Sequence, residues 1–298
     1  MEFKKAVGVV AVAAAFVSGA LHAQEADTLK KIEDTGEISL GYRESSVPFS
    51  YYDGKENVIG YSHDFQMRVL DAIKKKLNMP NLTVKMIPVT PQTRIPLVQN
   101  GTVDLECGST SNNLERAEQV SFSDTIFVIG TRLLTKKGSG IKEFADLKGK
   151  TVVTTAGTTS ERLLRKMNQD NGLGMKIISA KDHLESFETL ESGRAVAFMM
   201  DDALLAGERA MARNPDEYVI VGTPRSREAY GCMMRKDDTA FKAMIDEAIA
   251  KIETSGEADK IYQKWFESPI PPDGLNLHFP ENADIKALFK HPNDNAID

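Results

Sequence analysis

The chain has 298 residues, enough for one large domain or two of ordinary size. Hydrophobic residues make up 41% of it and charged residues 27%, a composition typical of soluble globular proteins. The formal net charge is -6, and the sequence has no long basic run and no RNA-binding motif, which argues against nucleic acid as a partner.

The first 23 residues have the pattern of a secretory signal peptide. Lys4 and Lys5 precede an apolar stretch of small residues over 6–20, and Ala23 offers a cleavage site before Gln24. The stretch is too short to span a membrane, and no later apolar stretch is long enough. We therefore expect an exported, soluble protein whose fold begins after the cleavage site.

From residue 28 the sequence alternates between helix and strand patterns. Apolar residues recur at every fourth position over 61–77, the spacing of a helix with one buried face. Thr90 and Pro91 suit the N-cap and first position of a helix that continues to Val98. The elements expected up to residue 107 are helices over 29–35, 61–77 and 90–98, and strands over 37–42, 82–89 and 103–107.

The remainder of the chain repeats this alternation. One long apolar strand is expected over 127–135, and Thr158 and Glu161 have the spacing of a capping box at a helix start. The other expected elements are strands over 151–155, 176–179, 195–200, 218–221 and 230–234, and helices over 184–192, 203–212, 241–255, 258–266 and 285–290. Such alternation predicts an α/β fold with mainly parallel sheets, one from block 37–130 and one from block 150–222.

Polar residues gather at one end of these strands. Ligands of such sheets bind beyond the carboxyl ends of the strands. The residues at or just past a carboxyl end are Arg43, Arg94, Ser109, Thr158, His183 and Asp201. Their shared position predicts one common cleft.

The segment 104–116 reads as a strand that runs into a polar turn and then a helix. Free backbone N–H groups at a helix start favour negative charge, and Ser109, Ser111 and Arg116 add donors that match a carboxylate. Taken alone, the segment also suits an ordinary capped helix, in which Asn112 is the N-cap and Glu115 follows three residues later.

The charged residues at the strand ends indicate what the cleft holds. Arg43, Arg94 and His183, together with Arg116, suggest a site for more than one carboxylate, although each alone also suits a solvated surface. Asp201 either caps the helix that follows it or accepts hydrogen bonds from an ammonium group.

Catalytic motifs are missing from the sequence. It has no Gly-x-Ser-x-Gly elbow, no Walker phosphate loop, no Gly-x-Gly-x-x-Gly turn after a strand and no His pair at metal spacing. His183 with Asp201 or Glu106 could form an acid–base pair, but neither a nucleophile nor a metal accompanies it. We predict no catalytic residue, no metal and no cofactor.

Four runs, over 43–51, 104–116, 157–161 and 200–203, resemble in this order the polar amino-acid-binding proteins of bacterial ABC importers. The glutamate/aspartate-binding branch is the most similar, and the resemblance extends over about 28–298. It implies a two-lobed periplasmic binding protein of type II, with two crossing strands as hinges. The expected division is a signal peptide over 1–23, lobe 1 over 28–131 plus 231–298, and lobe 2 over 132–230.

The resemblance also implies a role for each site residue. The α-carboxylate of an amino acid would be held by Arg116, Ser109, Ser111 and Thr159, and the α-ammonium by Asp201. Arg43, Arg94 and His183 would hold a side-chain carboxylate. Close relatives have Ser where this chain has Pro91, so the preference between glutamate and aspartate stays open.

The implied function is capture of L-glutamate or L-aspartate by a periplasmic monomer, which then delivers it to the membrane permease of an ABC importer. An exported small-acid dehydratase on the same scaffold, with His183 as acid and base, is the alternative, and a sensor for a membrane receptor is a third possibility. Cys107 and Cys232 lie in apolar runs and could remain buried thiols, but the family topology makes them neighbours and implies a disulfide.

Overall fold

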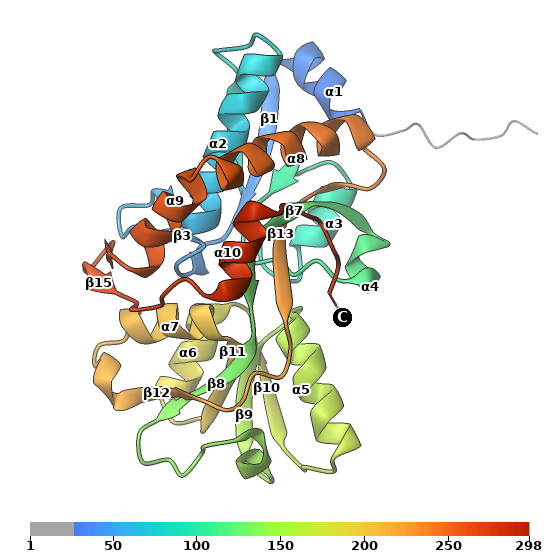
Figure 1. The fold of residues 1–298 in the computed structure, drawn as a ribbon. Helices are drawn as coiled ribbons and strands as arrows, with labels where there is room; N and C mark the ends of the chain where they lie inside the picture. Colours follow the sequence, from blue (N-terminus) through green and yellow to red (C-terminus); the bar gives the residue numbers. More distant parts are fainter. Residues whose placement is uncertain (1–26, 298) are drawn as a thin grey trace, which may run out of the picture.

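The computed structural model describes residues 27–297, so the predicted signal peptide over 1–23 lies outside the described residues. Figure 1 shows two lobes, one above the other. The first and last parts of the chain build the upper lobe, and the middle part builds the lower one. Within the described residues, the structure has no helix long and apolar enough to cross a membrane.

The upper lobe is built on a five-stranded sheet with the order β5-β1-β6-β13-β7. Its strands are β1 (Glu37–Tyr42), β5 (Thr83–Pro88), β6 (Leu105–Glu106), β7 (Val120–Ile129) and β13 (Glu228–Arg235). Four of the five strands run in the same direction, because only β13 pairs antiparallel to both of its neighbours. The sheet is therefore mainly parallel, as predicted.

Helices cover this sheet and complete the upper lobe. They are α1 (Thr28–Thr35), α2 (Tyr61–Lys76), α3 (Arg94–Gln99), α4 (Leu114–Ala117), α8 (Thr239–Thr254), α9 (Glu257–Phe266) and α10 (Ala283–Lys290). The short strands β2 (Ser45–Ser46), β3 (Ser50–Tyr52) and β4 (Val58–Ile59) form a second sheet, and β14 (Pro269–Ile270) pairs with β15 (Leu275–Asn276). The predicted helical spacing over 61–77 is confirmed, since Phe65, Val69 and Ile73 on α2 are fully buried.

The lower lobe repeats the same plan, with the strand order β10-β9-β11-β8-β12. Its strands are β8 (Thr131–Lys136), β9 (Thr151–Thr155), β10 (Lys176–Ala180), β11 (Ala197–Asp201) and β12 (Tyr218–Val221). Here β8 is the reversed strand, and the other four run in one direction. The helices are η1 (Phe144–Leu147), α5 (Thr159–Asp170), α6 (His183–Glu191), α7 (Asp202–Met211) and η2 (Pro215–Glu217).

The chain passes between the two sheets at Gly130, so the prediction of one continuous strand over 127–135 is wrong. Residues before Gly130 pair within the upper sheet and those after it within the lower one. A Cβ on Gly130 would lie 3.0 Å from both the Pro224 side chain and the Ser226 carbonyl of the returning segment. The apolar pattern over 127–135 gives no sign of this break, because β7 and β8 are both buried on either side of Gly130.

Two expected helix starts are also corrected. Thr90 and Thr93 bond to each other, with the Thr90 N–H donating to Thr93 Oγ1 at 2.9 Å, so residues 90–93 form a turn and the helix begins at Arg94. In α4 the N-cap is Asn113, whose Oδ1 accepts from the Arg116 N–H at 2.9 Å. Asn112 instead donates through its amide to the Asp294 carbonyl.

The predicted disulfide between Cys107 and Cys232 is confirmed. Both cysteines are fully buried and join the residue after β6 to the middle of β13. Beside them the core is aromatic: the Phe49 ring lies edge-on to Phe127 with centroids 4.9 Å apart, and edge-on to Tyr230 at 5.2 Å. The loops after β1 and β6 therefore rest on a rigid base.

Candidate functional site

The predicted site residues come from both lobes and meet between them. The upper lobe supplies Arg43 after β1, Arg94 at the start of α3, Ser109 and Ser111 after β6, and Arg116 in α4. The lower lobe supplies Thr159 and His183 at the starts of α5 and α6, and Asp201 at the end of β11. All are buried except Thr159, which is partly exposed.

The two lobes touch each other at this site. Arg116 donates through Nη1 to the Ser111 carbonyl at 3.0 Å in its own lobe, and through Nη2 to the Gly157 carbonyl at 3.2 Å in the other. Gly157 has a φ of +77°, and a Cβ there would lie 2.8 Å from the Gln92 side chain. Only glycine allows this close approach, so the structure has the lobes closed on each other.

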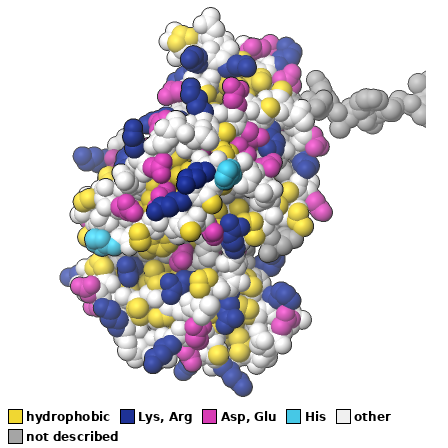
Figure 2. Space-filling model, in the orientation of Figure 1, with side chains coloured by type: hydrophobic (Ala, Val, Ile, Leu, Met, Phe, Trp, Pro, Cys, Tyr) yellow, Lys and Arg dark blue, Asp and Glu magenta, His cyan; other side chains and the backbone are white. Residues whose placement is uncertain are grey.

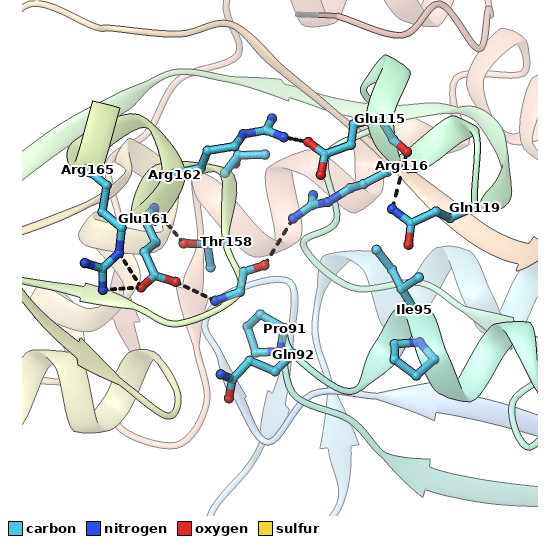
Figure 3. Close-up of a pocket in the computed structure, with 13 residues that line it drawn as sticks. Pro91, Gln92, Ile95, Glu115, Arg116, Gln119, Thr158, Glu161, Arg162 and Arg165 are labelled. Carbon is cyan, nitrogen blue, oxygen red and sulfur yellow. Dashed lines mark hydrogen bonds and ion pairs between the residues drawn. The ribbon is translucent and has the colours of Figure 1, made fainter. Parts of the chain in front are cut away.

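A cavity of about 620 Å³ opens where these segments meet (Figure 3). Arg116 and Thr159 line it, together with Pro91 of the turn before α3. An ion pair between Glu115 of α4 and Arg162 of α5 links the two lobes beside it. The other predicted site residues are buried outside this lining.

The α5 helix start is held by a modified capping box. Thr158 Oγ1 accepts from the Glu161 N–H at 3.0 Å, as the spacing predicts. The Glu161 carboxylate, however, accepts from the Gly157 N–H at 2.9 Å instead of from the cap residue. This bond orients Gly157, whose carbonyl receives the Arg116 contact.

Asp201 does not cap the helix that follows it, because its side chain makes no capping bond. Its Oδ1 accepts from Thr131 Oγ1 at 3.0 Å and from Ser160 Oγ at 3.1 Å, and its Oδ2 accepts from the Tyr230 hydroxyl. Burial and the nearby Glu228 carboxylate raise the pKa of Asp201 to about 7. An ammonium ion bound here would counter both effects.

Arg43 and Arg94 lie on either side of Ser109. Arg43 Nη1 donates to the Ser109 hydroxyl at 3.4 Å, and Arg94 Nη1 donates to the Ser109 carbonyl at 3.0 Å. Burial lowers the pKa of both guanidinium groups, and Arg116 lowers that of Arg94 further. Arg43 Nη2 and Arg94 Nε have no hydrogen-bond partner among the described residues.

Glu106 is a fully buried carboxyl group beneath these arginines. Its Oε2 accepts from Thr110 Oγ1 at 2.9 Å, whereas its Oε1 has no partner within residues 27–297. Burial raises the pKa of Glu106, and Arg94 and Arg43 act in the opposite direction. Gly108 makes room for it, since a Cβ there would lie 2.3 Å from Oε1.

His183 is buried with its ring between the lobes. Its Nδ1 lies 2.8 Å from Thr155 Oγ1, and its Nε2 has no partner in the described part of the chain. Burial, Arg43 and Arg94 hold the pKa of His183 well below its usual range, so the ring is neutral at neutral pH. Asp201 directs its carboxylate to hydroxyl groups, and no bond between it and His183 occurs among the described residues.

Several residues that shape the site were not predicted as members of it. They are Thr131, Thr155, Ser160 and Tyr230, while Glu106 was considered only as a partner for His183. Ser160 lies within a run that carries the family resemblance, so the sequence held a signal for it. Tyr230 gave none, because its hydroxyl reaches Asp201 from a strand of the other lobe.

The arrangement can hold a small zwitterion that carries additional negative charge. Three guanidinium groups supply donors for carboxylates, and Asp201 supplies an acceptor for an ammonium group. Among the described residues no group of three or more His, Cys, Asp or Glu side chains could hold a metal ion. Fold and site together define a two-lobed binding protein for small solutes.

Comparison with known proteins places this class in a family. The chain belongs to the bacterial extracellular solute-binding proteins, family 3, whose sequence profile matches residues 38–268. A "Glutamate/aspartate import solute-binding protein" of Salmonella typhimurium is 62% identical over 285 residues, which cover 94% of each chain. An "L-glutamate/L-aspartate-binding protein" of Pseudomonas aeruginosa is 61% identical over 290 residues, covering 97% of this chain and 96% of that one.

Solved structures agree with this assignment. An ancestral arginine-binding protein bound to arginine has a TM-score of 0.70 at 30% identity, covering 78% of this chain and 98% of its own. The relatives are binding and import proteins, so the chain is a solute-binding protein and the enzyme interpretation is set aside. The predicted family resemblance and two-lobed fold are thereby confirmed.

Proposed function

We propose that this protein binds glutamate or aspartate between its lobes and delivers it to the membrane permease of an ABC importer. The observation that carries the proposal is the buried pair Arg43 and Arg94, each of which bonds to Ser109 and keeps one donor without a partner among the described residues. Buried donors without partners are costly, and a carboxylate is the group that satisfies two guanidinium forks at once. The names of the relatives support the same ligands.

The common part of an amino acid would bind at the lobe contact. Arg116, Ser109, Ser111 and Thr159 would hold the α-carboxylate, and Asp201 would accept from the α-ammonium. Each charge-assisted hydrogen bond contributes about 1.5–3 kcal/mol in a site that excludes water. The Arg116 bond to Gly157 supports this placement, because it joins the lobes beside the ligand.

The side-chain carboxylate would bind to Arg43, Arg94 and His183. A neutral side chain such as that of glutamine would leave the two guanidinium groups underpaired, at a cost of several kcal/mol, on the order of the buried-charge penalty. Pro91 lines the cavity at the position where the family resemblance implies a serine, so the ranking of glutamate and aspartate is a matter for measurement.

Delivery requires the two lobes to move as units, and we propose that they divide at Gly130 and just before β13, close to the predicted bounds. Positive and negative side chains are interspersed over both lobes on the face in Figure 2. We propose that the protein is a periplasmic monomer, freed by cleavage near Ala23, and that its closed form docks on the permease. Loss of glutamate uptake in cells that lack this protein would support that role, and unchanged uptake would contradict it.

Calorimetric titration of the mature protein tests the binding proposal. Glutamate and aspartate should each bind at one molecule per chain, and glutamine and asparagine should bind at least about a hundredfold more weakly. The recovered ligand should be chemically unchanged, which also tests the dehydratase alternative. Failure of both acids to bind would overturn the proposal.

Pro91→Ser is the matched specificity variant. It introduces the hydroxyl group that the family resemblance implies at this position and lies outside the Arg43 and Arg94 contacts. We expect it to shift the ratio of glutamate to aspartate affinity while both acids still bind. A variant that bound neither acid would show instead that the proline is needed for the shape of the turn before α3.

A further inference from the structure

His183 is held by a short chain of polar groups on its far side. Its Nδ1 lies 2.8 Å from Thr155 Oγ1, which in turn lies 2.8 Å from Ser186 Oγ. The Ser186 hydroxyl donates to the Asp182 carbonyl at 2.8 Å. All of these groups are buried or partly buried, so water does not compete for the bonds.

The number of protons available to this row of polar groups determines which ring nitrogen of His183 carries a hydrogen. The three contacts of 2.8 Å need three protons, and the hydroxyl groups of Ser186 and Thr155 supply two. A fourth contact, from Thr155 Oγ1 to the Asp182 carbonyl, is much longer at 3.5 Å and can only share the Thr155 proton. The Asp182 carbonyl can only accept, so Ser186 donates to it and Thr155 donates to Ser186. The third proton must come from His183 Nδ1, which therefore carries the hydrogen of the neutral ring.

The other ring nitrogen is then a bare acceptor. Nε2 is buried and has no partner among the described residues. Arg43 and Arg94, the charges that most affect the ring, are cations of the other lobe that carry free donors and suit an acceptor. A carboxylate placed between the same arginines does not suit it, because two acceptors would face each other without a proton.

Resting on the proposed function, we infer that binding of an acidic amino acid takes up one proton from solvent at His183 Nε2. The new N–H bond donates to the ligand's side-chain carboxylate, while Nδ1 keeps its proton and its bond to Thr155. No covalent bond of protein or ligand breaks. The negative charge of the ligand offsets the positive charge of Arg43 and Arg94, which lowers the pKa of His183 when no ligand is bound.

The other acids near the ring lie on its own helix and on α7. Asp182 caps α6 by accepting from the Glu185 N–H at 2.9 Å, and Glu188 lies one turn further along. Glu208 on α7 is buried near Asp182 and Arg43. On the strands packed against α6, β2 and β9 supply only uncharged side chains such as Thr155, β11 ends in Asp201, and β10 supplies the exposed Lys176.

The proton uptake has a defined sign with pH. The pKa of His183 is low in the empty protein and higher in the complex, so binding takes up a proton at pH values between the two. Affinity for the acidic ligand then falls by up to tenfold per pH unit as pH rises through that range. Asp201 works in the opposite direction, because an ammonium ion expels its proton near pH 7.

Nitrogen NMR of ¹⁵N-histidine-labelled protein tests the inference. In the empty protein His183 should show a proton on Nδ1 only, and after addition of glutamate a proton on both nitrogens. A proton on Nε2 in the empty protein would overturn the inference whether or not glutamate binds. A ring that stays neutral in the complex would also overturn it.

Thr155→Val and Thr155→Ser form a matched pair of variants. Valine keeps the size but removes the acceptor for the Nδ1 proton, so its ring can carry the proton on Nε2 from the start. Calorimetry with glutamate in buffers of different ionisation enthalpy should show one more proton taken up by wild type and Thr155→Ser than by Thr155→Val. Equal counts in all three would contradict the inference, and absence of glutamate binding in wild type would count against the proposed function alone.

Discussion

The two ends of the site differ in how many of their buried polar atoms have a hydrogen-bond partner within the protein. At the Asp201 end, Thr131, Ser160 and Tyr230 already donate to the carboxylate. At the other end, polar atoms are buried but unpaired among the described residues: Arg43 Nη2, Arg94 Nε, Glu106 Oε1 and His183 Nε2. The fold satisfies the Asp201 end, and under the proposed function the side-chain carboxylate of the ligand binds at the other end.

This difference suggests how one scaffold serves many amino acids. Groups that every amino acid shares can be met by fixed acceptors and donors at no cost in selectivity. An unpaired buried polar atom costs about 1–3 kcal/mol, so a ligand that pairs several of them gains affinity that a poorer match does not. Selectivity should therefore depend on the unsatisfied end.

Charge reversal at Arg116 should break the Asp201 end. Arg116→Glu places a carboxylate beside the ligand's α-carboxylate and removes the bond to the Gly157 carbonyl. We expect the binding free energy to weaken by more than about 4 kcal/mol for acidic and neutral amino acids alike. Reversing the charge should cost more than removing it, because two carboxylates would then repel each other. Calorimetric titration measures it, and retained glutamate binding would show that the α-carboxylate lies elsewhere.

Removal of one guanidinium group should instead change the choice of ligand. Arg94→Gln removes a charge at the unsatisfied end and leaves Arg116 in place. We expect glutamate affinity to fall by roughly 3 kcal/mol, about a hundredfold, with a much smaller effect on glutamine. The measurement is the ratio of the two affinities, and an equal loss for both would contradict a separate side-chain end.

Glu253 on α8 shows what an unpaired buried acid does where no ligand is proposed. Neither of its carboxyl oxygens has a partner in the described part of the chain, and burial, with Asp124 nearby, raises its pKa to about 9. The unfolded chain releases this proton near pH 4.5, so stability is lost as pH rises from there to about 9.

Glu253→Gln should remove this pH-dependent loss. We expect it to stabilise the protein by about 2–3 kcal/mol at pH 7 and by almost nothing at pH 4, because the wild-type carboxyl is neutral in both states at low pH. Urea unfolding at the two pH values measures the difference. Ligand affinity should be unchanged, and a gain at pH 4 as large as at pH 7 would exclude titration as the cause.

The ion pair between Glu115 and Arg162 should matter least. Its side chains are 63% and 54% exposed, although it joins the two lobes. Exposed pairs contribute about 0–1 kcal/mol, so Arg162→Ala should weaken glutamate binding by less than about fivefold, and less still at high salt. Glu115→Gln is the matched control. A larger loss of affinity in either variant would show that surface charges control the closure of the lobes.

The sequence was sufficient for the fold class, and it singled out charged residues that the structure brings together between the lobes. Strand ends recur at Arg43, Ser109, His183 and Asp201, and parallel sheets bring such ends together. Their roles came from the family resemblance, because a guanidinium at a strand end does not by itself identify a carboxylate. Those roles stay predictions until binding is measured.

What the sequence could not supply depends on contacts between distant segments. The family resemblance put the lobe boundary near Gly130, but the close approach of this glycine to Pro224 and Ser226, almost a hundred residues later, has no local signal. Thr155 and Tyr230 join the site through the way helices and strands pack, and neither has a local signal. Periodicity reports which residues are buried, but not which partner a buried hydroxyl selects.

The disulfide has a consequence for the integrity of the chain. Cys107 precedes the first passage between the lobes and Cys232 follows the second, so the bond closes a covalent loop that contains the entire lower lobe. A protease that cuts once within that loop leaves the two pieces attached to each other. The cut protein should migrate as one species without reductant and as two fragments with it.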